Sequence, residues 1–204
     1  MSDQAQSRFH LPGATTIGLV FADGVILAAE KRVTYGSMIM SKTVKKVFKI
    51  ADTVGAACAG LVSDMQVLTR EVEAQAKLFA FDAKRPMTVK AASKVMSNVL
   101  FNRRMSPLIT QTIVGGMDDD KPAIYVLDVL GSLLPDDYAA VGSGAQMATG
   151  VLEQGYKPNM TQLNAKTLVL KAMKSAVRRD VMSGDGADFL IITKEGINEE
   201  TIKF

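Results

Sequence analysis

Cysteine and histidine, the side chains that most often serve as nucleophile, base or zinc ligand, occur once each, as Cys58 and His10. A zinc site made of these residue types is excluded, because such a site needs several of them. Cys58 lies in an apolar run with no partner histidine in view, which is typical of a small buried core residue. Chemistry by this chain therefore depends on hydroxyl groups, lysines and carboxylates.

Residues of these types gather in three short segments. Residues 13–18 read Gly-Ala-Thr-Thr-Ile-Gly, residues 142–144 read Gly-Ser-Gly, and residues 178–186 read Arg-Arg-Asp-Val-Met-Ser-Gly-Asp-Gly. Taken singly, Gly-Ser-Gly and Ser-Gly-Asp-Gly are usually turns. One hypothesis is a nucleotide-binding module that uses the Gly-Ser-Gly corner. The chain lacks a Gly-x-x-x-x-Gly-Lys-Ser/Thr motif, however, and Met147 stands where Gly-x-Gly-x-x-Gly needs its third glycine.

The composition is that of one globular domain. Of the 204 residues 48% are hydrophobic and 22% are charged, which argues against disorder. The net charge of +3 is spread along the chain, so neither nucleic acid nor a membrane surface is an expected partner. No apolar run approaches the roughly 20 residues that span a bilayer, and residues 1–13 lack the apolar segment of a signal peptide. With a single cysteine, a reducing, cytoplasmic location is expected.

The apolar patterns predict strands at both ends and in the middle of the chain. Two β-branched runs flank Asp23-Gly24, a dipeptide that favours a tight turn, and predict a hairpin. The predicted strands lie at about 16–22, 25–31, 47–52, 53–60, 108–116, 123–131, 132–141, 187–194 and 197–203.

Two pairs of helices are predicted between these strands. Apolar residues at steps of three and four predict a helix from Leu61 to at least Ala76. Thr88 is the predicted N-cap of a second helix, a short helix follows Gly144, and Thr161 is the predicted N-cap of a longer one. Paired helices disfavour a doubly wound parallel sheet. The predicted fold is α+β, a four-layer α-β-β-α sandwich of two antiparallel sheets flanked by helix pairs.

In this order and at this spacing, the segments resemble the proteasome β-subunit family, over nearly the whole chain. In that family a propeptide ends in glycine, and the mature chain begins Thr-Thr-Thr-Val/Ile-Gly with threonine as nucleophile. The pattern assigns residues 1–13 as propeptide, 14–204 as an N-terminal nucleophile hydrolase domain, and Ala14 as the nucleophile position. An acidic residue and a lysine follow the nucleophile by sixteen and thirty-two positions. These counts give Glu30, followed by Lys31-Arg32, and Lys46.

The remaining site residues are assigned by the same resemblance. Gly60, in the segment Ala-Gly-Leu-Val, matches the glycine whose amide holds the oxyanion. Ser143, Asp180 and Ser183 match the residues that position the terminal amine and its proton path, and Glu30 would orient Lys46. No metal or organic cofactor is expected.

The missing hydroxyl at Ala14 predicts an uncleaved Gly13–Ala14 bond and an inactive, zymogen-like chain. Without its nucleophile, the chain cannot perform the autocatalytic cleavage of the family. Thr15 is an alternative nucleophile, but its use would shift Glu30 and Lys46 by one residue. Two explanations stay open: a proteolytic subunit with its threonine replaced, or a naturally silent, structural β subunit of the ring.

Substrate and partners also follow from the resemblance. Family positions that line the primary pocket, which would favour cleavage after hydrophobic residues, map to Val33, Val44, Phe48, Cys58 and Val62. β subunits form stacked homo- or hetero-heptameric rings capped by rings of α subunits. They degrade unfolded polypeptides supplied by an ATPase cap. An α-type subunit is disfavoured by the polar leader, and the related two-tiered bacterial protease by the Thr-Thr-Ile-Gly start. The simple leader favours an archaeal-type particle.

Overall fold

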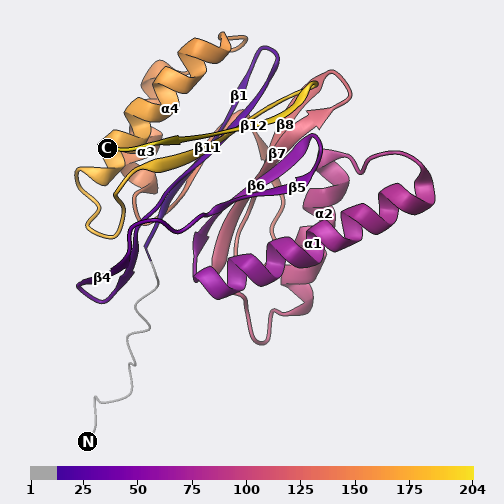
Figure 1. The fold of residues 1–204 in the computed structure, drawn as a ribbon, viewed down its shortest axis with the longest axis horizontal. Coiled ribbons are helices and arrows are strands. Elements are labelled where there is room, and N and C mark those ends of the chain that lie inside the picture. Colours follow the sequence, from indigo (N-terminus) through magenta and orange to yellow (C-terminus); the bar gives the residue numbers. More distant parts are fainter. Residues whose placement is uncertain (1–12) are drawn as a thin grey trace, which may run out of the picture.

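The computed structural model describes residues 13–204, and Figure 1 shows their arrangement. The first sheet is antiparallel, with strand order β10-β1-β2-β11-β12. Its strands are β1 (Thr15–Phe21), β2 (Gly24–Glu30), β10 (Tyr138–Gly142), β11 (Ala187–Thr193) and β12 (Gly196–Ile202). His10 and all of the expected propeptide except Gly13 lie outside the described residues.

The second sheet is also antiparallel, with strand order β5-β6-β7-β8-β9. Its strands are β5 (Val47–Ala51), β6 (Val54–Gly60), β7 (Thr110–Asp118), β8 (Lys121–Leu127) and β9 (Leu134–Asp136). The two sheets pack face to face around a buried cluster that contains Val25, Leu27 and Leu190 from the first sheet and Val47 and Ile113 from the second.

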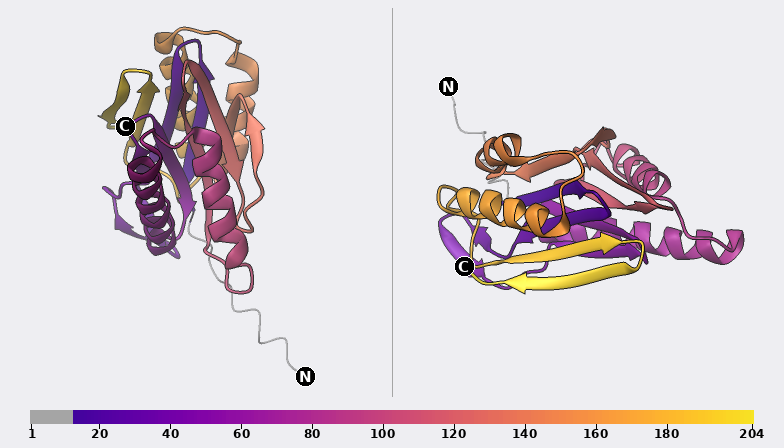
Figure 2. Two further views of the ribbon diagram at one scale, coloured as in Figure 1. Left: turned by 90° about the vertical axis from the view of Figure 1, so that its right-hand side faces the viewer. Right: turned by 90° about the horizontal axis from the view of Figure 1, so that it is seen from above.

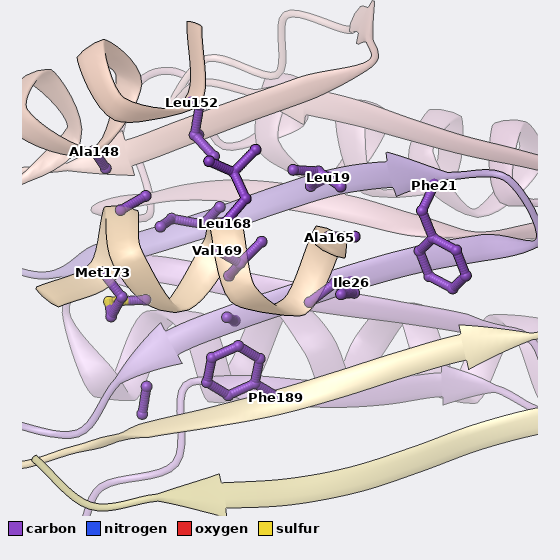
Figure 3. Packing of buried hydrophobic residues seen from close by; sticks show 14 of the residues in the cluster. Leu19, Phe21, Ile26, Ala148, Leu152, Ala165, Leu168, Val169, Met173 and Phe189 are labelled. Carbon is purple, nitrogen blue, oxygen red and sulfur yellow. The ribbon is translucent and has the colours of Figure 1, made fainter. Parts of the chain in front are cut away.

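Each sheet is covered on its outer face by a helix pair, as the two views in Figure 2 show. The helices are α1 (Val62–Ala83), α2 (Val89–Asn102), α3 (Ala145–Gly155) and α4 (Gln162–Val177). Figure 3 shows Leu168, Val169 and Met173 of α4 packed with Phe189 against the first sheet. A separate cluster joins α1 and α2 to the second sheet. The predicted four-layer α+β fold is therefore confirmed.

Two helix starts follow directly from local chemistry. Thr88 accepts a hydrogen bond from the Ala91 N–H at 3.1 Å, and Thr161 accepts one from the Asn164 N–H at 3.4 Å. These hydroxyls satisfy amide donors that have no partner within the first turn of a helix. Both predicted N-caps are confirmed.

The structure corrects three expectations. A third, two-stranded sheet, β3 (Val33–Tyr35) with β4 (Met38–Ser41), was not predicted. The strand expected at 132–141 is two strands, because β9 pairs with β8 in the second sheet and β10 pairs with β1 in the first. The hairpin turn consists of Ala22 and Asp23, and Gly24 already belongs to β2, paired with Phe21. A Cβ on Gly24 would lie 2.2 Å from the Ile192 carbonyl oxygen, so the glycine permits close approach of β11.

The strand registers bring distant segments to one end of the sandwich. In the first sheet, Thr15 at the start of β1 lies opposite Gly142 at the end of β10, and Glu30 at the end of β2 lies opposite Ala187 at the start of β11. In Figure 1 the start of β1 and the connection from α4 to β11 lie at the same end of the molecule.

Candidate active site

The first group of site residues surrounds the start of β1. The Ala14 N–H donates to Ser143 Oγ at 3.1 Å, and Ser143 Oγ donates to Asp180 Oδ2 at 2.5 Å. Ser183 Oγ donates to the same carboxylate oxygen at 2.6 Å. Ser143 follows the last residue of β10, whereas Asp180 and Ser183 lie in the connection from α4 to β11. The residue-14 nitrogen is thus linked through one hydroxyl to a carboxylate.

The second group is a buried ion pair between Glu30 and Lys46. Lys46 Nζ contacts Glu30 Oε1, and both side chains are almost completely buried. Lys46 Nζ also donates to the Arg32 carbonyl oxygen at 2.6 Å. Glu30 Oε2 accepts from the N–H groups of Arg32 at 2.7 Å and Gly184 at 3.0 Å. Every charged atom of the pair therefore has partners, which a buried charge requires.

Two effects oppose each other at Glu30. Burial raises the pKa of its carboxyl above the ordinary value, and the Lys46 ammonium and the N–H groups of Gly184 and Arg32 act to lower it. Removing any of these donors would leave a desolvated carboxylate with fewer partners. The Gly184 contact also joins the two groups, because Gly184 directly follows Ser183.

Glycines allow the backbone to close around residue 14. A Cβ on Gly142 would lie 2.1 Å from the Ala14 carbonyl oxygen, and one on Gly144 would lie 2.0 Å from Thr15 Oγ1. Gly60 has φ +147°, a conformation that other residues rarely adopt. The residue before it, Ala59, shares a buried cluster with Ala14. Gly60 therefore ends β6 close to the segment that begins β1.

The family described as "Proteasome subunit" matches residues 11–192, which is most of the chain. The chain belongs to the proteasome subunit family. Proteasome subunit beta 1 of Nitrosopumilus maritimus is 51% identical over 192 residues, covering 94% of this chain and 96% of that protein. Proteasome subunit beta 2 of Caldivirga maquilingensis is 45% identical over 203 residues, covering 100% of both.

A third relative, from Cenarchaeum symbiosum, is also named proteasome subunit beta 1. It is 50% identical over 189 residues, which cover 93% of this chain and 97% of the relative. These matches identify the chain as a proteasome β subunit of archaeal type. Across residues 13–204, no group of three or more His, Cys, Asp or Glu side chains is arranged to hold a metal ion. No helix in that range is long and apolar enough to cross a membrane.

The side chain of Thr15, the alternative nucleophile, is held by a hydrogen bond. Ala14 and Thr15 are both fully buried, but Thr15 Oγ1 lies 2.8 Å from Ser183 Oγ, which in turn donates to Asp180. A hydroxyl engaged in this way supports the carboxylate and is not free to attack a substrate.

The five predicted pocket residues come from separate elements around β5 and β6. Val33 begins β3, Val44 precedes β5, and Val62 begins α1. Phe48 pairs with Ala56, so Phe48, Ala56 and Cys58 share the face of the second sheet that α1 and α2 cover.

Cys58 is fully buried, and burial raises the pKa of its thiol to about 12. Phe48 lines a cavity of about 330 Å³ with Gln66 and Arg70 of α1. The specificity assignment stays a prediction.

The family resemblance pointed to Gly184 but assigned no role to Arg32 or Asp185. Arg32 Nε donates to Asp185 Oδ2 at 2.8 Å, and Arg32 Nη1 donates to the Val181 carbonyl oxygen at 2.9 Å. The only sequence signal is that Arg32 and Asp185 lie within the two segments that carry Glu30 and Ser183. Their partnership spans 153 positions, so no local pattern could have found it.

Proposed function

We propose that this chain is the proteolytic subunit of a threonine-type endopeptidase with its nucleophile position occupied by Ala14. The observation that carries the proposal is the hydrogen-bonded path from the Ala14 nitrogen through Ser143 to Asp180. A structural subunit has no need of a buried carboxylate connected by a hydroxyl to the nitrogen of its first strand. The nearby Glu30–Lys46 pair supports the same conclusion, because it places a buried ammonium at this end of the sandwich.

The path suits an N-terminal threonine. A threonine hydroxyl is a weak nucleophile that requires a base, and a free α-amino group titrates near ~8, close to physiological pH. In our proposal the residue-14 amine takes the hydroxyl proton, and Ser143 and Asp180 hold the amine and relay its proton. The Lys46 charge favours the developing alkoxide, and the Gly60 N–H stabilises the oxyanion. Loss of one oxyanion donor typically raises a barrier by about 2.7–4 kcal/mol.

With Ala14 the chemistry stops at its first step. A methyl group cannot attack the Gly13–Ala14 bond, so the residue-14 nitrogen stays a peptide N–H, which donates but cannot accept a proton. We therefore infer that residues 1–13 remain as an uncleaved propeptide and that the chain is inactive as written. The hydrogen bonds of the next two hydroxyls support this inference, because Thr15 Oγ1 is paired with Ser183 Oγ and Thr16 Oγ1 donates to the Cys58 carbonyl oxygen.

We propose that the chain assembles into heptameric β rings, alone or with a second β type, and that these rings stack with α-subunit rings. The names of its archaeal relatives support a proteasome particle. Enclosure in such a chamber limits proteolysis to unfolded polypeptides supplied by an ATPase cap. The apolar positions assigned to the primary pocket favour cleavage after hydrophobic residues in the active form; they are Val33, Val44, Phe48, Cys58 and Val62.

A second function is a silent, architectural β subunit, and the alanine at position 14 is the observation that favours it. The test is an Ala14→Thr substitution in the assembled particle, assayed with fluorogenic peptides that carry a hydrophobic residue before the scissile bond. Ala14→Val is the matched control, since valine has the shape of threonine without its hydroxyl. Hydrolysis by Ala14→Thr alone supports the proteolytic function. Silence of both variants supports the architectural one.

A further inference from the structure

The side chain of Arg32 connects the end of β2 to the connection between α4 and β11. The proposed mechanism requires these two segments to keep a fixed separation. Its guanidinium donates to Asp185 Oδ2 at 2.8 Å and to the Val181 carbonyl oxygen at 2.9 Å. Both acceptors belong to the connection between α4 and β11 that also supplies Asp180 and Ser183. One side chain thus contacts this connection on both sides of Ser183.

The backbone of the same residue contacts the buried ion pair. The Arg32 N–H donates to Glu30 Oε2 at 2.7 Å, and the Arg32 carbonyl accepts from Lys46 Nζ at 2.6 Å. Arg32 therefore contacts Glu30 and Lys46 through its main chain and the 180–186 connection through its side chain.

The connection is shaped to receive the guanidinium. A Cβ on Gly184 would lie 2.3 Å from Arg32 Nη2 and 2.4 Å from Cζ, so the guanidinium occupies the space above the glycine Cα. Asp185 has φ +67° and Gly186 has φ +118°, conformations that L-residues rarely adopt. The bond to Arg32 helps to hold this turn, because a non-glycine residue in such a conformation needs support from its surroundings.

Arg32 and Asp185 each stabilise the charged form of the other. The hydrogen bond from Arg32 lowers the pKa of Asp185 below its ordinary value, and the same bond raises the pKa of Arg32. The side chains of Arg32 and Asp185 are 20% and 17% exposed, so water screens the pair only in part. Arginine suits this position because its planar group donates from two separate nitrogens, Nε and Nη1, whereas lysine has a single nitrogen.

We propose that Arg32 and Asp185 act as a positioning pair, which fixes the Asp180–Ser183 segment relative to the Glu30–Lys46 pair. This inference rests on the proposed proteolytic function, since its consequence for catalysis requires an active threonine form. Neither residue touches the reacting atoms in this account. Their effect is transmitted through the Gly184 N–H to Glu30 and through the position of Ser183 beside Asp180.

The first test uses the chain as it is, with Ala14, in its assembled particle. Hydrogen exchange measured by mass spectrometry reports the opening of peptides that cover 181–186. Arg32→Lys and Asp185→Asn are each expected to speed exchange in this segment by about tenfold or more, the effect of losing roughly 1.4 kcal/mol of local stability. Glu73→Gln, which breaks an exposed pair with Lys77 on α1, is the control and should leave the segment unchanged. Unchanged exchange in Asp185→Asn would overturn the proposal.

The second test introduces the same substitutions into the Ala14→Thr form. Asp185→Asn is expected to lower kcat about ten- to hundredfold with KM within about twofold, because small displacements of catalytic groups slow chemistry without altering uniform binding. The Arg32→Lys and Asp185→Asn effects should not add fully in the double variant, because both substitutions disrupt the same Arg32–Asp185 contact. Equal kcat in all variants, or additive losses, would overturn the positioning role. If the Ala14→Thr parent itself is silent, the proteolytic function fails, and the exchange result alone decides whether the pair holds the segment.

Discussion

Replacing Lys46 by methionine tests how the buried ion pair contributes to the fold. The side chains of Lys46 and Glu30 are 1% and 0% exposed, and they lie at the end of the sandwich where four strands meet. Lys46→Met retains the volume of the side chain but removes the positive charge. Glu30 would then keep two donors, the N–H groups of Arg32 and Gly184, for a buried carboxylate.

The cost follows from the general behaviour of broken buried pairs. Removing one partner leaves an uncompensated charge and destabilises a protein by about 3–5 kcal/mol. Glu30→Gln should be similarly costly, because it leaves a buried ammonium. In the double variant both charges are gone, so its loss should fall short of the sum of the single losses by about 2 kcal/mol or more. Glu73→Gln, on the exposed surface of α1, should cost less than about 1 kcal/mol.

The pH dependence of the stability of Lys46→Met provides an independent test. Burial already raises the Glu30 pKa above 4.5, and loss of Lys46 removes the principal opposing effect. In Lys46→Met, the Glu30 carboxyl loses its proton at lower pH in the unfolded state than in the folded state. The stability of this variant therefore falls as the pH rises from 4.5 through the raised pKa of folded Glu30. The cost of Lys46→Met should therefore be larger at pH 8 than at pH 5.

Urea unfolding provides the measurement, followed by circular dichroism because the chain has no tryptophan. All variants need the same subunit concentration and a confirmed assembly state, since association stabilises the folded form. Single losses that add within about 0.5 kcal/mol, or a cost independent of pH, would refute the reasoning.

Three further predictions concern other features of the chain. The Cys58 thiol, with a pKa of about 12 and no exposed surface, should react with a thiol reagent at pH 8 only after unfolding; rapid labelling of the folded protein would contradict this. Gly60→Ala should destabilise the protein by about 1–3 kcal/mol, because φ is +147° and the Ile109 carbonyl oxygen lies 2.2 Å from the added Cβ; an unchanged urea midpoint would count against it. Thr88→Ala should cost about 1 kcal/mol through loss of the N-cap of α2, whereas Thr88→Ser should cost little.

Features that depend on neighbouring residues could be predicted from the sequence. Thr88 and Thr161 cap helices by hydrogen bonds to residues three positions on, so their role is visible in a short window. The order of strands and paired helices was sufficient to predict the layers. Glu30 and Lys46 were assigned by the spacing of the resembling family, and the structure pairs them.

Features that depend on distant partners could not be predicted. The 132–141 segment was interpreted as one strand although Pro135-Asp136-Asp137 interrupts its apolar residues, and its pairing with β8 and with β1 places the two halves in different sheets. The β3–β4 hairpin is largely exposed and lacks the alternation of apolar and polar residues that marks a half-buried strand. The sequence suggested that Gly24 is a turn residue. In the structure a glycine is needed there because the Ile192 carbonyl of β11 approaches its Cα closely. The Arg32–Asp185 pair likewise exists only once the chain has folded.

In our proposal, Ala14 occupies the position of a nucleophile which would otherwise cleave its own propeptide. The intact mass of the chain, measured from assembled particles of the Ala14 protein and of Ala14→Thr, tests it most directly. We expect the Ala14 chain to retain the Gly13–Ala14 bond and the Ala14→Thr chain to begin at residue 14. An Ala14 chain that has lost residues 1–13, or an Ala14→Thr chain that keeps them, would contradict the account.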